Sequence, residues 1–303
     1  MWPCFASDIS SMAESASIRA LVGGIVDYAG LFPPAGLDMA AAVNNYASYR
    51  SGGHAWMLGR FVCPVARLDE FVAAMPAGAG EGPWRLSVIV GADDAADFER
   101  VARFNEDSCP ATIDAAEVKL QAAAIGAVAE RIPPGVRVYV EIPRGEDPRD
   151  AIKAVKAAHV RAKIRTGGVT ADAFPQIDEI ARFVRACYAA GVAFKATAGL
   201  HHPLRSRHRL TYDDDAPSGT MHGFLNVFLA AAFCYNGIGA ADTPRLLGLE
   251  STDELEFSDD GVAWEEYRLS AAEIETIRKR FATSFGSCSF EEPVAELASL
   301  NLI

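Results

Sequence analysis

The sequence predicts an α/β fold, a (β/α)8 TIM barrel that forms a single domain over residues 1–303. Apolar strand-like runs alternate with alanine-rich segments of helical spacing, which is typical of a parallel sheet covered by helices. Eight such units in 303 residues match the usual size of this barrel. A doubly wound open sheet is the alternative, but the first run ends in Asp27-Tyr28-Ala29-Gly30, without the GxGxxG turn of a dinucleotide-binding fold.

The expected strands are short and apolar throughout, as strands buried on both faces of a parallel sheet are. We expect them at Gly24–Leu31, Ala55–Cys63, Leu86–Gly91, Ala116–Leu120, Val136–Ile142, Ala162–Thr166, Val192–Thr197 and Leu246–Leu249. The segments between them carry apolar residues at helical spacing. We expect helices at Asp69–Ala77, Ala95–Phe104, Ala122–Ile132, Pro148–His159 and Ile177–Ala190.

The C-terminal part of the chain, residues 252–303, is expected to add a hairpin, a helix and an extended tail to the barrel. Phe257–Trp264 contains Asp260-Gly261, a pair that favours a tight hairpin turn. Ser270 and Glu273 have the spacing of a capping box, which predicts a final helix to about Thr283. The tail that follows is expected to fold back on the barrel, and residues 1–12 are expected to be flexible.

Two further stretches depart from a minimal barrel. His201–Gly219 is a long polar connection after the seventh expected strand, and such connections are usually functional or mobile. Gly223–Ala241 is the longest apolar run and approaches the length of a membrane span. Because Asn226 and Asn236 interrupt that run, we expect a buried helix there.

Composition excludes several classes of function. The formal net charge is −12, which argues against nonspecific binding of nucleic acid. The N-terminus lacks the basic start and apolar core of a signal peptide. We therefore expect a cytoplasmic protein that acts on a small molecule, without nucleic-acid or membrane partners, and that is compatible with a homo-oligomer. The six cysteines are scattered without a CxxC pair, which suits a reducing compartment: Cys4, Cys63, Cys109, Cys187, Cys234 and Cys288.

Two lysines within apolar strands are the most informative residues of the chain. Lys163 and Lys195 lie in adjacent expected strands, and each strand runs into a turn of small residues. Lysine is rarely buried unless it is paired. One interpretation is structural, with each ammonium reaching a carboxylate at a strand end. The other is chemical, because a desolvated lysine beside a second cation becomes a nucleophile toward carbonyl groups.

Strand alternation predicts which polar side chains meet at the mouth of the barrel. Residues two apart share a strand face, so Lys163 lies with Arg165, Lys195 with Thr197, Tyr139 with Glu141, and Glu117 with Lys119. The opposite register would turn the lysines toward the helices. In the inward register, the mouth is expected to hold Asp27, Lys119, Glu141, Lys163, Arg165, Lys195 and a histidine from His201-His202.

About 40 residues around these lysines resemble the two-lysine region of deoxyribose-phosphate aldolases. Lys163-Ile164-Arg165-Thr166-Gly167 is similar to the family's KTSTG-type strand, and Phe194–Gly199 is similar to its FKxxGG-type strand 32 residues later. The resemblance implies a class I aldolase on a (β/α)8 barrel, with Lys163 forming an imine and Lys195 lowering its pKa. Glu141 falls at the family's IIET-like strand and Asp27 near its early aspartate, whereas Lys119 stands where the family has a catalytic aspartate.

The function expected first is a lyase that forms a Schiff base with a small anionic carbonyl compound and needs no cofactor or metal. Lys163, Lys195 and Glu141 are the expected catalytic residues. The expected substrate-binding residues are Asp27, Lys119, Arg165, Thr197, His201 and His202.

The alternatives are a non-covalent or metal-assisted isomerase or hydrolase, and a non-catalytic ligand-binding barrel. A metal set could combine His201, His202 and His208 or His222 with Glu141 or Glu250. Cys288 could be a nucleophile, although no local signature supports it.

Overall fold

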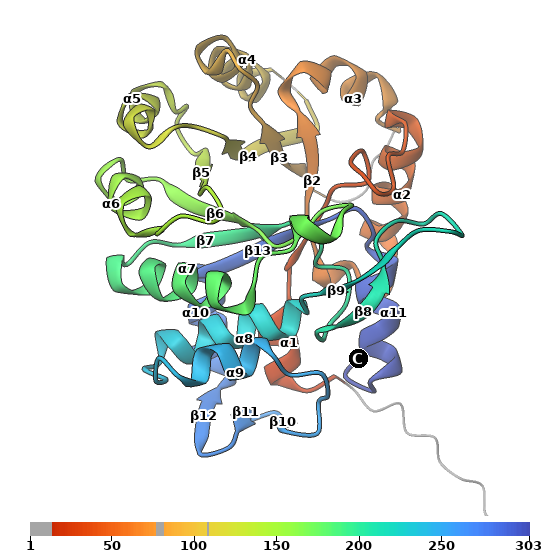
Figure 1. The fold of residues 1–303 in the computed structure, drawn as a ribbon. Coiled ribbons are helices and arrows are strands. Elements are labelled where there is room, and N and C mark those ends of the chain that lie inside the picture. The colour runs from red at the N-terminus through yellow and green to blue at the C-terminus, as the bar shows by residue number, and fades with distance from the viewer. Residues whose placement is uncertain (1–13, 77–81, 108) are drawn as a thin grey trace, which may run out of the picture.

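Eight parallel strands close into a barrel, which confirms the predicted (β/α)8 fold (Figure 1). The computed structural model describes residues 14–76, 82–107 and 109–303, so the predicted flexibility of residues 1–12 lies outside the described part. Hydrogen-bonded neighbours around the barrel are, in order, β1 (Val26–Tyr28), β13 (Ala282–Ser287), β7 (Phe194–Thr197), β6 (Arg161–Arg165), β5 (Arg137–Glu141), β4 (Ala111–Val118), β3 (Trp84–Ile89) and β2 (Leu58–Pro64).

Helices surround the strands because each carries one apolar stripe that packs on the outward face of the sheet. The helices of the outer layer are α2 (Met39–Ser51), α3 (Leu68–Ala74), α4 (Asp94–Glu106), α5 (Ile125–Val128), α6 (Arg149–Ala157), α7 (Ile177–Ala190) and α8 (Phe224–Tyr235). Short 3₁₀ turns occur at Ala55–Met57, Val65–Arg67, Ala122–Ala124, Ala129–Arg131 and Ala171–Ala173. The helix expected over Ala122–Ile132 is therefore broken into short turns around α5.

The eighth strand is not where the sequence placed it. Leu246–Leu249, the expected strand, begins as the last two residues of helix α9 (Asp242–Leu247) and continues past its C-cap at Gly248, because a four-residue apolar run does not distinguish a buried helix from a strand. The eighth strand is β13, whose residues were expected to form the end of the final helix, to about Thr283, and the start of the C-terminal tail. The residues of β13 are mostly small and polar, a composition typical of loops. One of them, Ser284, points into the barrel and donates to the Asp27 carboxylate.

The remaining C-terminal elements agree with the sequence. β10 (Leu255–Phe257) and β11 (Gly261–Trp264) form the predicted hairpin, and β12 (Tyr267–Ser270) extends it to a three-stranded sheet. The capping box of Ser270 and Glu273 opens α10 (Ala271–Arg280) as expected. α1 (Ala16–Val22) packs on α10, and α11 (Glu291–Ser299) follows the eighth strand.

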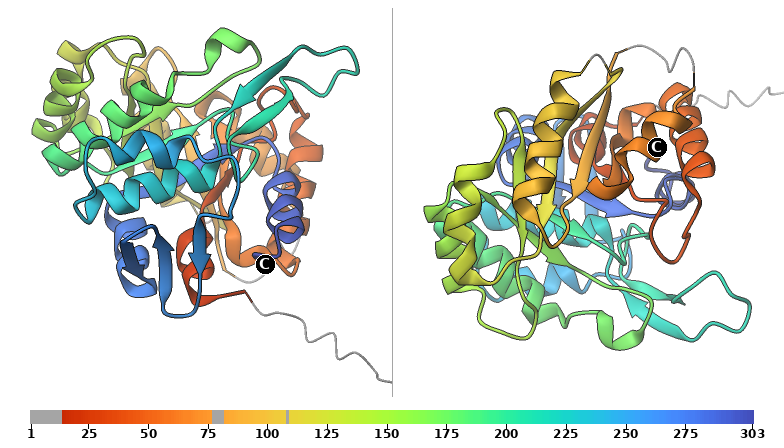
Figure 2. Two further views of the ribbon diagram at one scale, coloured as in Figure 1. Left: turned by 60° about the horizontal axis from the view of Figure 1, so that its bottom comes forward. Right: turned by 90° about the horizontal axis from the view of Figure 1, so that it is seen from above.

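The long polar connection after β7 forms a hairpin of its own. β8 (Ser206–Arg209) and β9 (Ser218–Met221) pair antiparallel, and the tip of this hairpin projects from the body of the molecule in both views of Figure 2. The apolar run after it forms α8, which is buried along almost its whole length, as expected. Among the described residues, no helix combines the length and apolar character needed to cross a membrane.

Replacing Phe285 with alanine tests the assignment of β13 to the barrel. Phe285 is fully buried and its ring stacks on Phe224 of α8, with 5.1 Å between ring centroids. We expect the free energy of unfolding, measured by urea denaturation, to fall by about 3–5 kcal/mol because a large buried side chain is lost. The control Val72→Ala, at a side chain 47% exposed, should change it by less than about 0.5 kcal/mol. An equally small change for Phe285→Ala would contradict the assignment.

Candidate active site

Two lysines and three carboxylates meet in the interior of the barrel. Lys163 of β6 and Lys195 of β7 lie side by side in the strand register, and both reach Glu117 of β4. Lys195 Nζ lies 2.6 Å from Glu117 Oε1 and 2.7 Å from Asp27 Oδ2. Lys163 Nζ lies 3.0 Å from Glu117 Oε2 and 3.0 Å from Glu141 Oε2. Each ammonium is therefore held between two carboxylates.

These contacts continue into a row of alternating charges that we call the charge ladder. It runs Arg60, Asp27, Lys195, Glu117, Lys163 and Glu141, and the Arg60 guanidinium lies 3.7 Å from the Asp27 carboxylate. Three neutral groups also donate hydrogen bonds to two of these carboxylates. Ser87 donates to Glu117, Ser284 donates to Asp27, and the Arg60 backbone N–H donates to Asp27. The ladder thus has fixed side-chain positions as well as balanced neighbours.

The ladder keeps Asp27, Glu117 and Lys195 charged although they are buried. Burial alone raises the pKa of Asp27 and of Glu117, but the neighbouring cations, Lys195 foremost, outweigh it and leave both pKa values below their usual range. Burial lowers the pKa of Lys195, yet Asp27 and Glu117 outweigh that effect and raise the pKa above its usual value. A buried charge is tolerated only when it is paired in this way.

A cavity of about 480 Å³ opens above the ladder at the carboxyl ends of the strands, where active sites of (β/α)8 barrels lie. Glu117, Glu141 and Lys163 contribute to its lining. Lys119 and Arg165 line it as exposed cations, and neither forms an ion pair within the described part of the chain. An apolar wall comes from the other side of the barrel and includes Phe32, Pro33, Pro34, Val62, Ile89 and Val90.

The structure distributes the expected site residues over two levels. Lys119, Glu141, Lys163, Arg165, Thr197 and His201 line the cavity. Lys195 and Asp27 are fully buried beneath it and do not line it. His202 faces away from it, toward the C-terminal helix, where its Nδ1 lies 2.5 Å from Glu296 Oε1.

Glu117 is the functional residue that was missing from the expected site. Strand alternation placed Glu117 on the same face as Lys119, but of these two residues only Lys119 was expected at the mouth of the barrel. In the structure Lys119 is exposed at the rim, and Glu117, two residues deeper, contacts both lysines. The sequence did contain a signal for Glu117. A carboxylate inside an apolar strand needs a buried cation, and two lysines in apolar strands had no partner assigned to them.

Two other candidates near the cavity have structural explanations. Cys288 lines the cavity, but burial raises the pKa of its thiol and Tyr212 Oη lies 3.6 Å from Sγ, so no feature activates it. Gly167 and Gly199 let the loops after β6 and β7 touch. A Cβ at Gly199, whose φ is +72°, would lie 2.8 Å from the Gly167 Cα. The close approach requires glycine at both positions.

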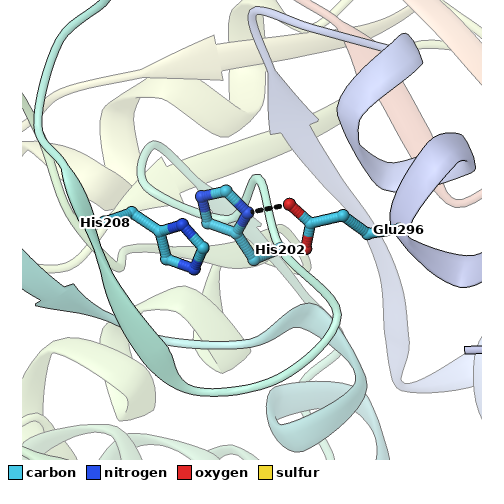
Figure 3. A group of neighbouring side chains, drawn as sticks. All are labelled: His202, His208 and Glu296. Atoms are coloured by element: carbon cyan, nitrogen blue, oxygen red, sulfur yellow. Dashed lines mark hydrogen bonds and ion pairs between the residues drawn. The ribbon is translucent and has the colours of Figure 1, made fainter. Parts of the chain in front are cut away.

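One group of side chains has the composition of a metal site. Figure 3 shows His202 between His208 and Glu296, and their donor atoms lie within 4.8 Å of one another. The two imidazole rings are stacked, with 3.3 Å between centroids and 8° between planes. A histidine binds a metal in the plane of its ring, so two parallel stacked rings cannot direct their lone pairs at one ion. The group does not fit a metal in this arrangement.

The other residues of the expected metal set lie elsewhere. The Nε2 atom of His222 is 2.7 Å from the Pro175 carbonyl oxygen, and Glu250 pairs with Arg205. His201 Nδ1 lies 2.9 Å from Glu292 Oε2, which fixes the imidazole at the edge of the cavity.

Replacing Glu117 with glutamine tests the ladder. At pH 7 the change should lower the free energy of unfolding by about 3–5 kcal/mol, because two buried ammonium groups lose a shared carboxylate. The folded-state pKa of Glu117 lies below the unfolded value of about 4.3, so its stabilisation is complete above that pH and is lost as the pH falls below it. Urea denaturation from pH 7 to 3 should therefore show the gap between wild type and Glu117→Gln narrowing below about pH 4.3.

The control is Glu130→Gln, at an exposed carboxylate outside the barrel interior. It should leave stability within about 0.5 kcal/mol at every pH. A gap for Glu117→Gln that is small at pH 7, or that stays constant down to pH 3, would contradict the paired arrangement.

Comparison with known proteins adds no family to this geometry: no family model, no curated protein and no solved structure matches the chain.

Proposed function

We propose that the protein is a lyase that forms a Schiff base between Lys163 and a small anionic carbonyl compound. The observation that carries the proposal is the position of the Lys163 amine. It lines the cavity, where a substrate can reach it, and it contacts two carboxylates that can take and return protons. Proton transfer by a positioned carboxylate is the assistance that imine formation needs.

The two lysines have different roles in this proposal. Lys195 is completely buried, does not line the cavity and has a raised pKa, so it is a fixed cation and not a nucleophile. Its charge holds Glu117 beside Lys163. Lys195 is therefore a positioning residue, which differs from the pKa-lowering role that the family resemblance implies for it.

The covalent step begins and ends with one positive charge on Lys163 Nζ. Glu141 takes a proton from the Lys163 ammonium, and the free amine attacks the carbonyl carbon to form the C–N bond. The carbonyl oxygen then receives that proton, takes a second one from nitrogen and leaves as water. Ammonium and carbonyl become iminium and water, so Glu117 stabilises a cation at Nζ before and after the step.

The iminium then accepts the electron pair of the bond between the α and β carbons of the substrate as that bond breaks. A hydroxyl group on the departing fragment loses its proton to a carboxylate and becomes a carbonyl. The remaining enamine takes a proton on carbon, and water hydrolyses the imine to restore Lys163. Glu141 lies close enough to Nζ to serve as acid and base in these transfers.

The lining of the cavity indicates the type of substrate. Lys119 and Arg165 line it as cations without an ion pair in the described part of the chain, and apolar side chains make up much of the remaining lining. A carboxylate or phosphate would bind the cations, and Arg165 can hold it through two parallel hydrogen bonds. A volume of about 480 Å³ suits a small metabolite.

A non-covalent isomerase or hydrolase is the second candidate, favoured by one observation. The Lys163 ammonium contacts two carboxylates, and this arrangement also serves an enzyme that uses fixed charges to stabilise an anionic transition state. The two candidates differ in whether a covalent adduct forms.

Borohydride trapping distinguishes them. Incubation with a panel of small aldehydes and keto acids, followed by reduction and peptide mass mapping, should add the substrate mass to Lys163. The adduct should disappear in Lys163→Ala and persist in Lys153→Ala, a control at an exposed lysine on α6. An adduct on Lys195 instead would overturn the assignment of Lys163 as the nucleophile, and the absence of any adduct in folded protein would overturn the Schiff-base proposal.

Glu141→Gln should lower kcat for the trapped substrate by about 10²–10⁴-fold, because a general acid–base group is lost while the lysine remains. The Glu130→Gln variant, changed at an exposed site, should keep wild-type kcat. Steady-state kinetics with circular dichroism as a folding control make the comparison. Unchanged turnover in Glu141→Gln would remove this residue from the mechanism.

A further inference from the structure

The opposite end of the barrel contains a second cavity, of about 750 Å³, lined by basic side chains. It lies at the amino ends of the strands, between the starts of β3, β5 and β13 and the helices α1 and α10. Six cations line it, although the chain as a whole carries a net charge of −12. They are Arg19, Arg60, Arg85, Arg137, Arg278 and Lys279.

These cations exceed the acidic groups available to them. Arg60, Arg85 and Arg137 all pair with the single carboxylate of Asp114. Lys279 pairs with Glu275 and Arg19 with Glu14. Apart from Asp27, which Arg60 shares with Lys195, six positive charges therefore face three negative ones in the described part of the chain.

Arg278 has no carboxylate partner among the described residues. Its side chain is 7% exposed and donates only to backbone carbonyl oxygens, including those of Leu21 and Thr283. Burial lowers its pKa to about 9, and burial together with Arg60 lowers the pKa of Arg137. Burial is the larger cause in both cases, and Arg60 differs from them because Asp27 and Asp114 raise its pKa.

We propose that this cavity binds a small polyanion with at least two phosphate groups. Arginine is the side chain best suited to phosphate because its planar fork donates two parallel hydrogen bonds. The half-exposed side chains of Arg85 and Arg137 are available at the entrance, with Arg278 buried in the wall. The volume lies within the usual range for small-ligand sites and exceeds what one phosphate would fill.

The site is separate from the candidate active site. The ring of Tyr139 lies between them: it lines the second cavity and its centroid is 5.6 Å from Lys195 Nζ. Arg60 connects the two ends, because it lines the second cavity and contacts Asp27 in the ladder. Binding here does not depend on the chemistry proposed for Lys163.

Isothermal titration of the full chain with pyrophosphate tests this proposal. We expect binding with Kd below about 1 mM at moderate salt, and a 1:1 complex in Lys119→Gln/Arg165→Gln, which lacks the cations of the other mouth. Arg85→Gln/Arg137→Gln should weaken binding at least about tenfold, and both positions are exposed enough for the variant to fold. The control Arg67→Gln/Arg149→Gln makes the same change in net charge at exposed pairs elsewhere and should bind like wild type.

A third variant, Lys119→Gln/Arg165→Gln, removes the cations proposed to hold an anionic substrate at the other mouth, and it should keep the affinity of the site at the amino ends. The proposal is overturned if folded wild-type protein does not bind pyrophosphate, or if the Arg67/Arg149 control loses as much affinity as the Arg85/Arg137 variant. It is also overturned if only the Lys119/Arg165 variant loses binding.

Discussion

The shared carboxylate of Glu117 is the interaction on which the rest of the barrel interior depends. Two ammonium groups from adjacent strands would repel each other in a buried site, and this carboxylate lies within 3.0 Å of both. Parallel strand register brings Lys163 and Lys195 to one level, and β4 supplies the opposing charge from two strands beyond β6 and three beyond β7. A fold that closes these strands into a ring is what makes the arrangement available.

The barrel is chemically different at its two ends although one row of charges connects them. The carboxyl ends of the strands hold a reachable amine, two carboxylates and an apolar wall, which suits reaction of a small carbonyl compound. The amino ends hold an excess of guanidinium groups, which suits binding of an anion without reaction. Arg60 belongs to both regions, because it lines the cavity at the amino ends and contacts Asp27 of the ladder.

Much of the fold and part of the site could be predicted from the sequence. Apolar strands alternating with helices indicated the barrel, and a lysine within each of two such strands indicated a buried polar centre. The predicted position of the eighth strand was wrong because Ala282–Ser287 consists mostly of small and polar residues, whereas the apolar Leu246–Leu249 resembles a strand in sequence. Glu117 was overlooked because alternation gives the face of a residue but not its depth. The arginines at the amino ends are dispersed in sequence and converge only through barrel closure.

An alternating row of buried charges also restricts how this sequence can change over evolution. Loss of any one member leaves its neighbours with uncompensated charge in a medium of low dielectric, which folded proteins rarely tolerate. Simultaneous loss of two adjacent members, such as Asp27 and Lys195, removes one positive and one negative charge and leaves the sum unchanged. We therefore expect substitutions at these buried positions to occur in pairs of opposite charge. Substitutions on the exposed faces of the helices can occur one at a time.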